Sequence, residues 1–307
     1  MTWSYAELLA KAKVYVERAM AEDREGPLFP FWAALGLELM ARATLARVHP
    51  ALLADPTDGS NLMYAFGYPT TGRPKSIPAK TLFLRCQTVV PNFTKSEFDS
   101  CMSLVERRNE ELHTGAPAFD DFPTSLWLAD FFRVTALMLD AQKLKLTDLF
   151  SGDDAKAAEK MMAKAEKDEI GRVKKLVAAA VTVFEALSEA EKTTNVAAAK
   201  LANASRRPRL SKITNCPACK QETGLLVGEL VSTSEPKAEE DAVTVDLAVL
   251  PTSLSCAVCG LKLTPHTSLA VVGLGGQFTK QESYEPSEYY QIEFDPADYY
   301  EPEYGND

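Results

Sequence analysis

Apolar residues recur at helical spacing along the first half of the chain. Two segments begin with a capping box, Ser4 with Glu7 and Thr94 with Glu97, in which a hydroxyl and a carboxylate satisfy the first turn of a helix. Apolar residues then follow in register until Pro or Gly interrupts them. The pattern predicts helices over residues 4–24, 31–48, 59–67, 78–90, 94–113 and 124–146. Residues 1–150 are therefore expected to form one all-α bundle with short connections.

From residue 151 the chain turns to Ala, Lys and Glu and stays strongly helix-forming to about residue 205. Residues 151–210 are therefore expected to form a helical arm that ends in an exposed basic connector. Apolar residues between Val173 and Leu187 form a stripe along this arm. Such a stripe must pack on another element of the protein.

The period changes again beyond residue 211. Segments 224–232, 242–250 and 268–273 are rich in Val and Leu and are broken by Ser, Pro and Gly, which predicts short strands. Residues 276–307 combine acids with tyrosines and predict a tail. We therefore expect a mainly α protein, in which the bundle and the arm precede a small C-terminal β domain over residues 211–275.

Composition narrows the class of protein. With 46% apolar and 25% charged residues, the chain is typical of a globular protein. The net charge of -10 belongs to the tail, because residues 281–307 hold nine acids and no Lys or Arg. No apolar run reaches the ~18 residues that span a bilayer, and the N-terminal residues lack a signal-peptide pattern. We expect a cytoplasmic location and no membrane partner.

Four cysteines form two C-x-x-C pairs, Cys216 with Cys219 and Cys256 with Cys259, separated by 36 residues. Thiolates three residues apart can take adjacent corners of a tetrahedron, so the spacing predicts one structural Zn²⁺ per chain. Residues 211–275 then resemble a zinc ribbon. Unligated thiols and a redox dithiol are the alternatives, but no thioredoxin-like βαβ pattern surrounds either pair.

The helix over 94–113 carries polar residues where its pattern calls for apolar ones. On a helical wheel Arg108, Asn109 and His113 lie on or beside the apolar stripe, whereas Arg107 points to the opposite side. Burying such groups costs free energy unless partners or a function offset it. This end of the helix is therefore the best candidate for chemistry.

Arg108-Asn109-x-x-x-His113 resembles the R-x4-6-H motif of the HEPN superfamily. In helix 31–48, Glu38-x-x-x-Arg42-Ala43 is similar to the E-x-x-x-[KR]-A pattern of an early helix in many HEPN bundles. The resemblance covers about residues 1–150. It implies a metal-independent endoribonuclease of a prokaryotic toxin or antiviral defence system, which acts as a homodimer on RNA beside a possible companion defence protein.

The same resemblance assigns roles. His113 would act as general base or acid, Arg108 would stabilise the phosphorane, Asn109 would orient groups, and Glu38 would support the site. Cleavage would leave a 2′,3′-cyclic phosphate and a 5′-hydroxyl. A structural interpretation stays open, in which Arg108 pairs with Glu38 or another carboxylate and His113 is a helix-terminal histidine.

A second function class also stays open. The bundle could be a non-catalytic dimeric adaptor, with the zinc ribbon and the tail holding a protein or nucleic-acid partner. The tail would either solubilise the chain or dock as a strap. Four basic residues in and after the connector are the nominated contacts for RNA phosphates: Arg206, Arg207, Arg209 and Lys212.

Overall fold

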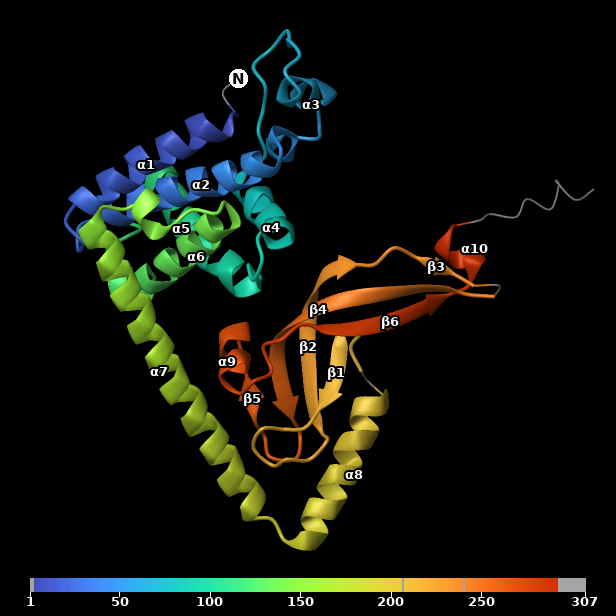
Figure 1. The fold of residues 1–307 in the computed structure, drawn as a ribbon. Coiled ribbons are helices and arrows are strands. Elements are labelled where there is room, and N and C mark those ends of the chain that lie inside the picture. The colour runs from blue at the N-terminus through green and yellow to red at the C-terminus, as the bar shows by residue number, and fades with distance from the viewer. Residues whose placement is uncertain (1–2, 206, 240, 292–307) are drawn as a thin grey trace, which may run out of the picture. The chain divides into compact units, whose positions relative to one another are not determined.

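The computed structural model describes residues 3–205, 207–239 and 241–291. The chain divides into two compact units, Met1–Arg172 and Val173–Asp307, which meet within one long helix, α7 (Gly152–Glu185), drawn in Figure 1. Each unit has a hydrophobic core of its own.

The first unit is an all-α bundle whose helices follow the sequence pattern closely. Its capping boxes and Pro and Gly stops fall where the chain predicts them. Besides the first part of α7, the unit contains α1 (Tyr5–Ala21), α2 (Leu28–Val48), α3 (Gly59–Ala65), α4 (Ala79–Val89), α5 (Lys95–His113) and α6 (Leu128–Ala141). Short 3-10 turns lie at Pro50–Leu53, Thr124–Leu126 and Leu146–Asp148.

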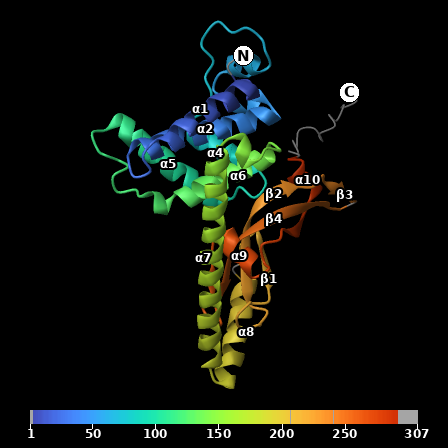
Figure 2. The same ribbon diagram turned by 60° about the vertical axis from the view of Figure 1, so that its left-hand side comes forward.

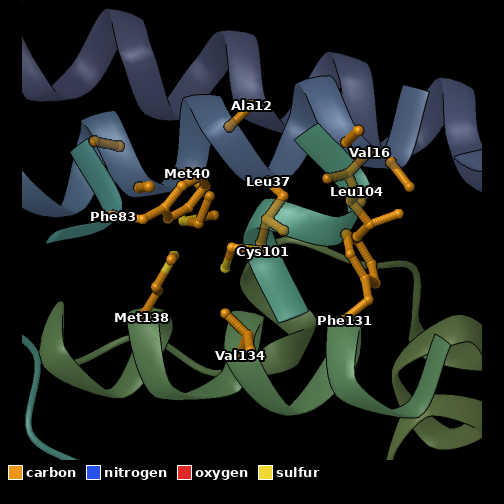
Figure 3. Close-up of a cluster of buried hydrophobic side chains, with 14 of the residues drawn as sticks. Ala12, Val16, Leu37, Met40, Phe83, Cys101, Leu104, Phe131, Val134 and Met138 are labelled. Atoms are coloured by element: carbon orange, nitrogen blue, oxygen red, sulfur yellow. The ribbon is translucent and has the colours of Figure 1, made fainter. Parts of the chain in front are cut away.

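Helix α2 is the core element of the bundle, and other helices pack on most of its faces. In Figure 3 Leu37 and Met40 point from α2 into the bundle interior, where Leu104 of α5 and Met138 of α6 also lie. Because α2 is apolar nearly all round, it is also long and apolar enough to cross a membrane by length and composition, and 61% of its most apolar window is buried in the bundle.

The start of α5 is fixed by a buried carboxylate. Glu97 accepts hydrogen bonds from the backbone N–H and the hydroxyl of Thr94, which completes the predicted capping box. Arg133 of α6 forms an ion pair with the same carboxylate and also with Asp130. The first turn of α5 is therefore tied to α6 by charge as well as by packing.

The second unit joins the end of α7 and α8 (Glu189–Ser205) to an antiparallel sheet. Val173 and Ala180 of α7 lie in one core with the strands, so the apolar stripe of the arm packs there. The strands are β1 (Ser211–Thr214), β2 (Gly224–Thr233), β3 (Lys237–Ala238), β4 (Val243–Cys256), β5 (Lys262–Leu263) and β6 (Phe278–Tyr284), with the short helices α9 (His266–Val271) and α10 (Pro286–Tyr289).

Strand β4 organises this sheet. The order is β1-β2-β4-β3, and β5 and β6 also pair with β4. The register of β2 against β4 shifts at Gly228, where a Cβ would overlap the carbonyl oxygen of Leu250, so only glycine fits. In Figure 1 the long strands β2, β4 and β6 curl strongly.

The expected fold class is therefore wrong. With 56% helix, 14% strand and a curled antiparallel half-barrel, the protein is α+β rather than mainly α with a small ribbon. Residues 268–271 lie in α9 and residues 272–273 in the turn after it, not in a strand, because a short apolar run fits either element and Pro265 and the Ser268 hydroxyl favour a helical turn. Residues 278–284, expected in the tail, form β6 along β4.

Close packing of α1 on α2 generates a stability prediction. A Cβ at Gly36 would lie 2.9 Å from Cγ2 of Val16. We expect Gly36→Ala to lower the free energy of unfolding by about 1–3 kcal/mol through overpacking. Urea unfolding followed by tryptophan fluorescence measures this unit alone, because Trp3, Trp32 and Trp127 all belong to it.

The matched control is Gly171→Ala in α7, where no atom lies within 4 Å of the added Cβ. This change should leave the free energy unchanged or raise it, since alanine favours helix over glycine. A Val16→Ala change should relieve part of the Gly36→Ala loss. Equal effects of Gly36→Ala and Gly171→Ala would contradict the packing argument.

Candidate functional site

Two loops bring the four expected cysteines to one end of the sheet in the second unit. Cys216 and Cys219 lie between β1 and β2, whereas Cys256 ends β4 and Cys259 precedes β5. Gly224 of β2 pairs with Cys256 of β4 in the antiparallel ladder, and this pairing holds the two loops beside each other.

The two loops have the same hydrogen bonds. The N–H of Lys220 donates to the carbonyl of Cys216, and the N–H of Gly260 donates to that of Cys256, at 3.0 and 2.9 Å. The first cysteine of each pair donates to the carbonyl five residues on, in Gln221 or Leu261. Lys220 and Gly260 both have positive φ, 61° and 73°, which turns the chain after each pair.

The four sulfurs lie within 4.8 Å of one another and are buried. Sγ of Cys216 lies 3.6 Å from that of Cys259, and Sγ of Cys219 lies 3.7 Å from that of Cys256. Metal–sulfur bonds of ~2.3 Å in a tetrahedron place sulfurs about 3.8 Å apart. The cluster therefore has the dimensions of a four-thiolate metal site, and these residues could hold a metal ion.

Thr223 adds a contact outside the four cysteines. Its Oγ1 lies 3.3 Å from Sγ of Cys256, and hydrogen bonds from Cys216, Cys259 and Thr223 lower the pKa of the Cys256 thiol. A hydroxyl beside a ligand sulfur stabilises its thiolate form. Sequence reasoning missed Thr223, because a single threonine four residues after a C-x-x-C pair carries no signal of its own.

The other predicted site lies in the bundle, where α2 and α5 bring three charged groups together. Glu38 accepts from Arg108 Nη2 at 2.6 Å with one oxygen and from Arg42 at 2.7 Å with the other. All three side chains are 14–15% exposed. The two sequence segments of the HEPN-like pattern therefore meet in one cluster, which carries two positive charges and one negative.

Arg42 also connects this cluster to the chain before α4. Its guanidinium donates to the hydroxyl of Ser76 at 3.0 Å and to the carbonyl of Ile77 at 3.1 Å. The sequence pattern placed Arg42 beside Glu38 but gave no hint of these contacts, since they cross 35 residues.

The polar residues that follow Arg108 lie at the surface. Asn109 and His113 are exposed, and their spacing of four residues places them on one face of the last helical turn. Leu112, between them in sequence, is 53% exposed. Nε of Arg108 is buried and makes no hydrogen bond within the described chain. The expected residues are thus neighbours on α5, and Arg108 alone is anchored.

The acids near the motif lie on an adjacent face. Glu106 and Glu110 line a groove of about 520 Å³ with Lys80 and Met102, and none of Arg108, Asn109 and His113 lines it. Arg107 points away from the motif and donates to the carbonyl of Ala118. The acids therefore do not cover the exposed ends of the motif.

The basic connector makes contacts within the second unit. Arg209 forms an ion pair with Glu282 of β6 at 2.7 Å, and Arg207 donates to the carbonyl of Ser211 at 2.8 Å. Lys212 on β1 is exposed, and Arg206 lies outside the described residues. Of the nominated RNA contacts, Arg209 is therefore already engaged by a carboxylate.

Comparisons with protein-family models, with curated proteins and with solved structures find no match to this chain. The function must therefore be argued from these two clusters and the surfaces around them.

The Arg209–Glu282 pair generates a pH prediction. Hydrogen bonds from Arg209 and then Tyr284 lower the pKa of Glu282 from 4.5 to about 2. A depressed pKa means that the pair stabilises the folded unit above pH 4.5 and loses this contribution as the pH falls toward 2. Carboxyl NMR titration should show the Glu282 pKa rising toward 4.5 in Arg209→Ala. An unchanged titration would exclude the ion pair.

Proposed function

We propose that this chain is a metal-independent endoribonuclease of the HEPN type, with a structural zinc in its second unit. One observation carries the proposal: Glu38, Arg42 and Arg108 come from two segments that each resemble a HEPN pattern, and they form one hydrogen-bonded cluster. The exposed Asn109 and His113 stand beside it on α5.

The cluster suits an anionic substrate. Two guanidinium groups share one carboxylate, which leaves a net positive charge at the site. Arg108 donates to Glu38 through Nη2, which leaves other guanidinium donors that Glu38 does not use. A planar guanidinium held in place by a carboxylate is preorganised to bind phosphate oxygens and to stabilise charge that develops on them.

The chemistry then follows from the imidazole. His113 removes the proton of the ribose 2′-OH, whose oxygen attacks the adjacent phosphorus, and the bond to the 5′-oxygen breaks. An acid protonates the leaving oxygen, so the products are a 2′,3′-cyclic phosphate and a 5′-hydroxyl. One chain supplies one such imidazole, and a two-fold homodimer would supply both an acid and a base.

We assign the metal as zinc. Four buried thiolates in a tetrahedron leave no coordination position for a substrate, which is the arrangement of structural zinc sites. The ion would stabilise the sheet end at which β4 and β5 meet. We further propose that the enzyme acts in the cytoplasm of a prokaryote, as a toxin or in antiviral defence.

The adaptor remains a second candidate because of Arg108. At 14% exposure and 2.6 Å from Glu38, this residue has the features of a structural ion pair. An adaptor would need Arg108 for stability and would not need His113 at all. The two candidates therefore differ in what the exposed histidine does.

Cleavage of total cellular RNA in EDTA decides between them. We expect His113→Ala to reduce the rate by about 10²–10⁴-fold, as loss of a general acid or base does, without changing thermal stability. Arg108→Lys should also lose activity, because lysine keeps the charge but lacks the planar fork. End-group analysis should find 2′,3′-cyclic phosphates.

Leu112→Ala is the matched control, since Leu112 is exposed on the same helical turn. This variant should cleave as the parent protein does. A wild-type chain that cleaves nothing, in which Arg108→Ala lowers stability, would favour the adaptor. Activity that stops at once in EDTA and returns with magnesium would contradict the assigned chemistry.

The metal assignment is tested by elemental analysis of protein purified without chelator. We expect about one zinc per chain, and a loss of zinc in Cys219→Ser and Cys256→Ser. Cys86→Ala is the control, because Cys86 is buried in the helical bundle. Iron in place of zinc would contradict the assignment.

Chelation of the metal should affect the second unit and leave the first unit folded. Removal of the ion should unfold the end of the sheet, since a structural metal site supplies folding free energy. Tryptophan fluorescence should stay unchanged, because every tryptophan lies in the first unit.

A further inference from the structure

One stretch of the first unit has a charge opposite to that of the whole chain. Between Asp58 and Glu97 the sequence contains no acid and five basic residues, whereas the chain has a net charge of -10. The five are Arg73, Lys75, Lys80, Arg85 and Lys95. This stretch comprises α3, the loop over residues 66–78, α4 and the chain that leads into the first turn of α5.

The start of this loop exposes aromatic side chains. Phe66 and Tyr68 are 57% and 58% exposed, and Met63 before them is 47% exposed. The ring of His49 lies 4.8 Å from that of Phe66, at 44°. In both ribbon views α3 and this loop project from one end of the helical unit (Figures 1 and 2). We call Met63, Phe66, Tyr68 and Arg73 the loop surface.

The loop is held by hydrogen bonds to its own unit. Asn61 is buried, and its side chain accepts from the N–H of Lys75 at 2.7 Å and donates to the carbonyl of Asp55 at 3.1 Å. Ser76 pairs with Ala54 in a β-bridge. The aromatic rings are therefore carried on a fixed frame, which reduces the entropy that a ligand must offset.

The cations of the loop are not equivalent. Lys75 lies near Asp55 and Asp58, whose pKa values are lowered mainly by hydrogen bonds to Thr57 and Ser60 and further by this lysine. Arg73 is exposed and takes part in no salt bridge within the described residues. Arg73 is therefore the cation available to a ligand.

The loop leads to the cluster on α2 and α5. Its last residues, Ser76 and Ile77, accept hydrogen bonds from Arg42, and Arg42 shares Glu38 with Arg108. Only two side chains thus separate the base of the loop from Arg108. A ligand that contacts both sites would meet a cation at each, which favours an anionic chain.

We propose that the loop surface binds single-stranded RNA, with bases stacked on Phe66 and Tyr68 and a phosphate on Arg73. Exposed aromatic rings beside an unpaired cation are how proteins hold single strands, because every base has a face that can stack. The choice of RNA rests on the proposed ribonuclease function. The loop surface would hold the strand on one side of the cleavage site.

Fluorescence anisotropy with a labelled oligouridylate tests the proposal in the His113→Ala protein, which does not consume the probe. Phe66→Ala and Tyr68→Ala should each weaken binding by about 5- to 150-fold, the loss of one stacked base. Phe66→Trp should retain affinity, because tryptophan also stacks. Arg73→Ala should reduce the slope of log K against log salt by about 0.7, the loss of one phosphate contact.

Two control variants remove a similarly exposed side chain and a positive charge outside the loop surface. Leu126→Ala removes a side chain that is 65% exposed in the same unit, and Lys160→Ala removes an exposed cation of α7. Neither should change affinity or salt slope. If no RNA binds, or if the loop variants bind as the controls do, the proposal is wrong.

RNA binding by the loop surface and RNA cleavage that depends on His113 can be lost independently. Unchanged binding in the loop variants, together with cleavage that depends on His113, would remove the loop surface and keep the enzyme. Binding that depends on Phe66 and Tyr68 in a chain that cleaves no RNA would keep the loop surface and remove the enzyme.

Discussion

The carboxylate of Glu38 is the point at which the helical unit is held together around its candidate site. Each of its oxygens binds a different arginine, one from α2 and one from α5, and the α2 arginine continues to the chain before α4. Removal of this carboxylate would leave the guanidinium groups of Arg42 and Arg108 partly buried without a counter-charge, which is strongly unfavourable. Three features therefore depend on the negative charge of Glu38: the position of Arg108, the attachment of the loop before α4, and the packing of α5 on α2.

The helices of the first unit could be predicted from the sequence because their signals are local. Capping boxes, helical spacing and Pro or Gly stops act within a few residues, so the predicted ranges and the observed helices nearly coincide. The sheet could not be predicted as well. Residues 278–284 alternate between partly buried and exposed positions, but Lys280 and Glu282 lie on the partly buried side, where a strand pattern calls for apolar residues. Only pairing with β4 therefore distinguishes this strand from a tail.

The candidate sites divide in the same way. The C-x-x-C pairs could be recognised because a ligand pair needs a fixed short spacing, and the sulfurs indeed converge. The pairing of Arg108 with Glu38 could be offered from the sequence only as one interpretation, because the helical pattern does not say which helices meet across 70 residues. The aromatic residues at 66 and 68 carried no signal, because an exposed aromatic ring and a buried one look alike in a sequence. The absence of acids over residues 59–96 was visible in the sequence, but net charge summed over the whole chain conceals it.

Strand β4 also determines the order in which the chain can acquire structure. Its ladders pair Gly224 with Cys256 and Val243 with Tyr284, so a long chain segment must close before either ladder forms. The first unit is built largely from helices that are neighbours in sequence. During synthesis the helical unit emerges first and can fold while its ribosome is still making the sheet. The four-cysteine cluster cannot form until Cys256 and Cys259 have been synthesised, after Cys216 and Cys219. In that interval the first cysteine pair is a nascent half-site, open to oxidants and competing metals, beside an already folded domain.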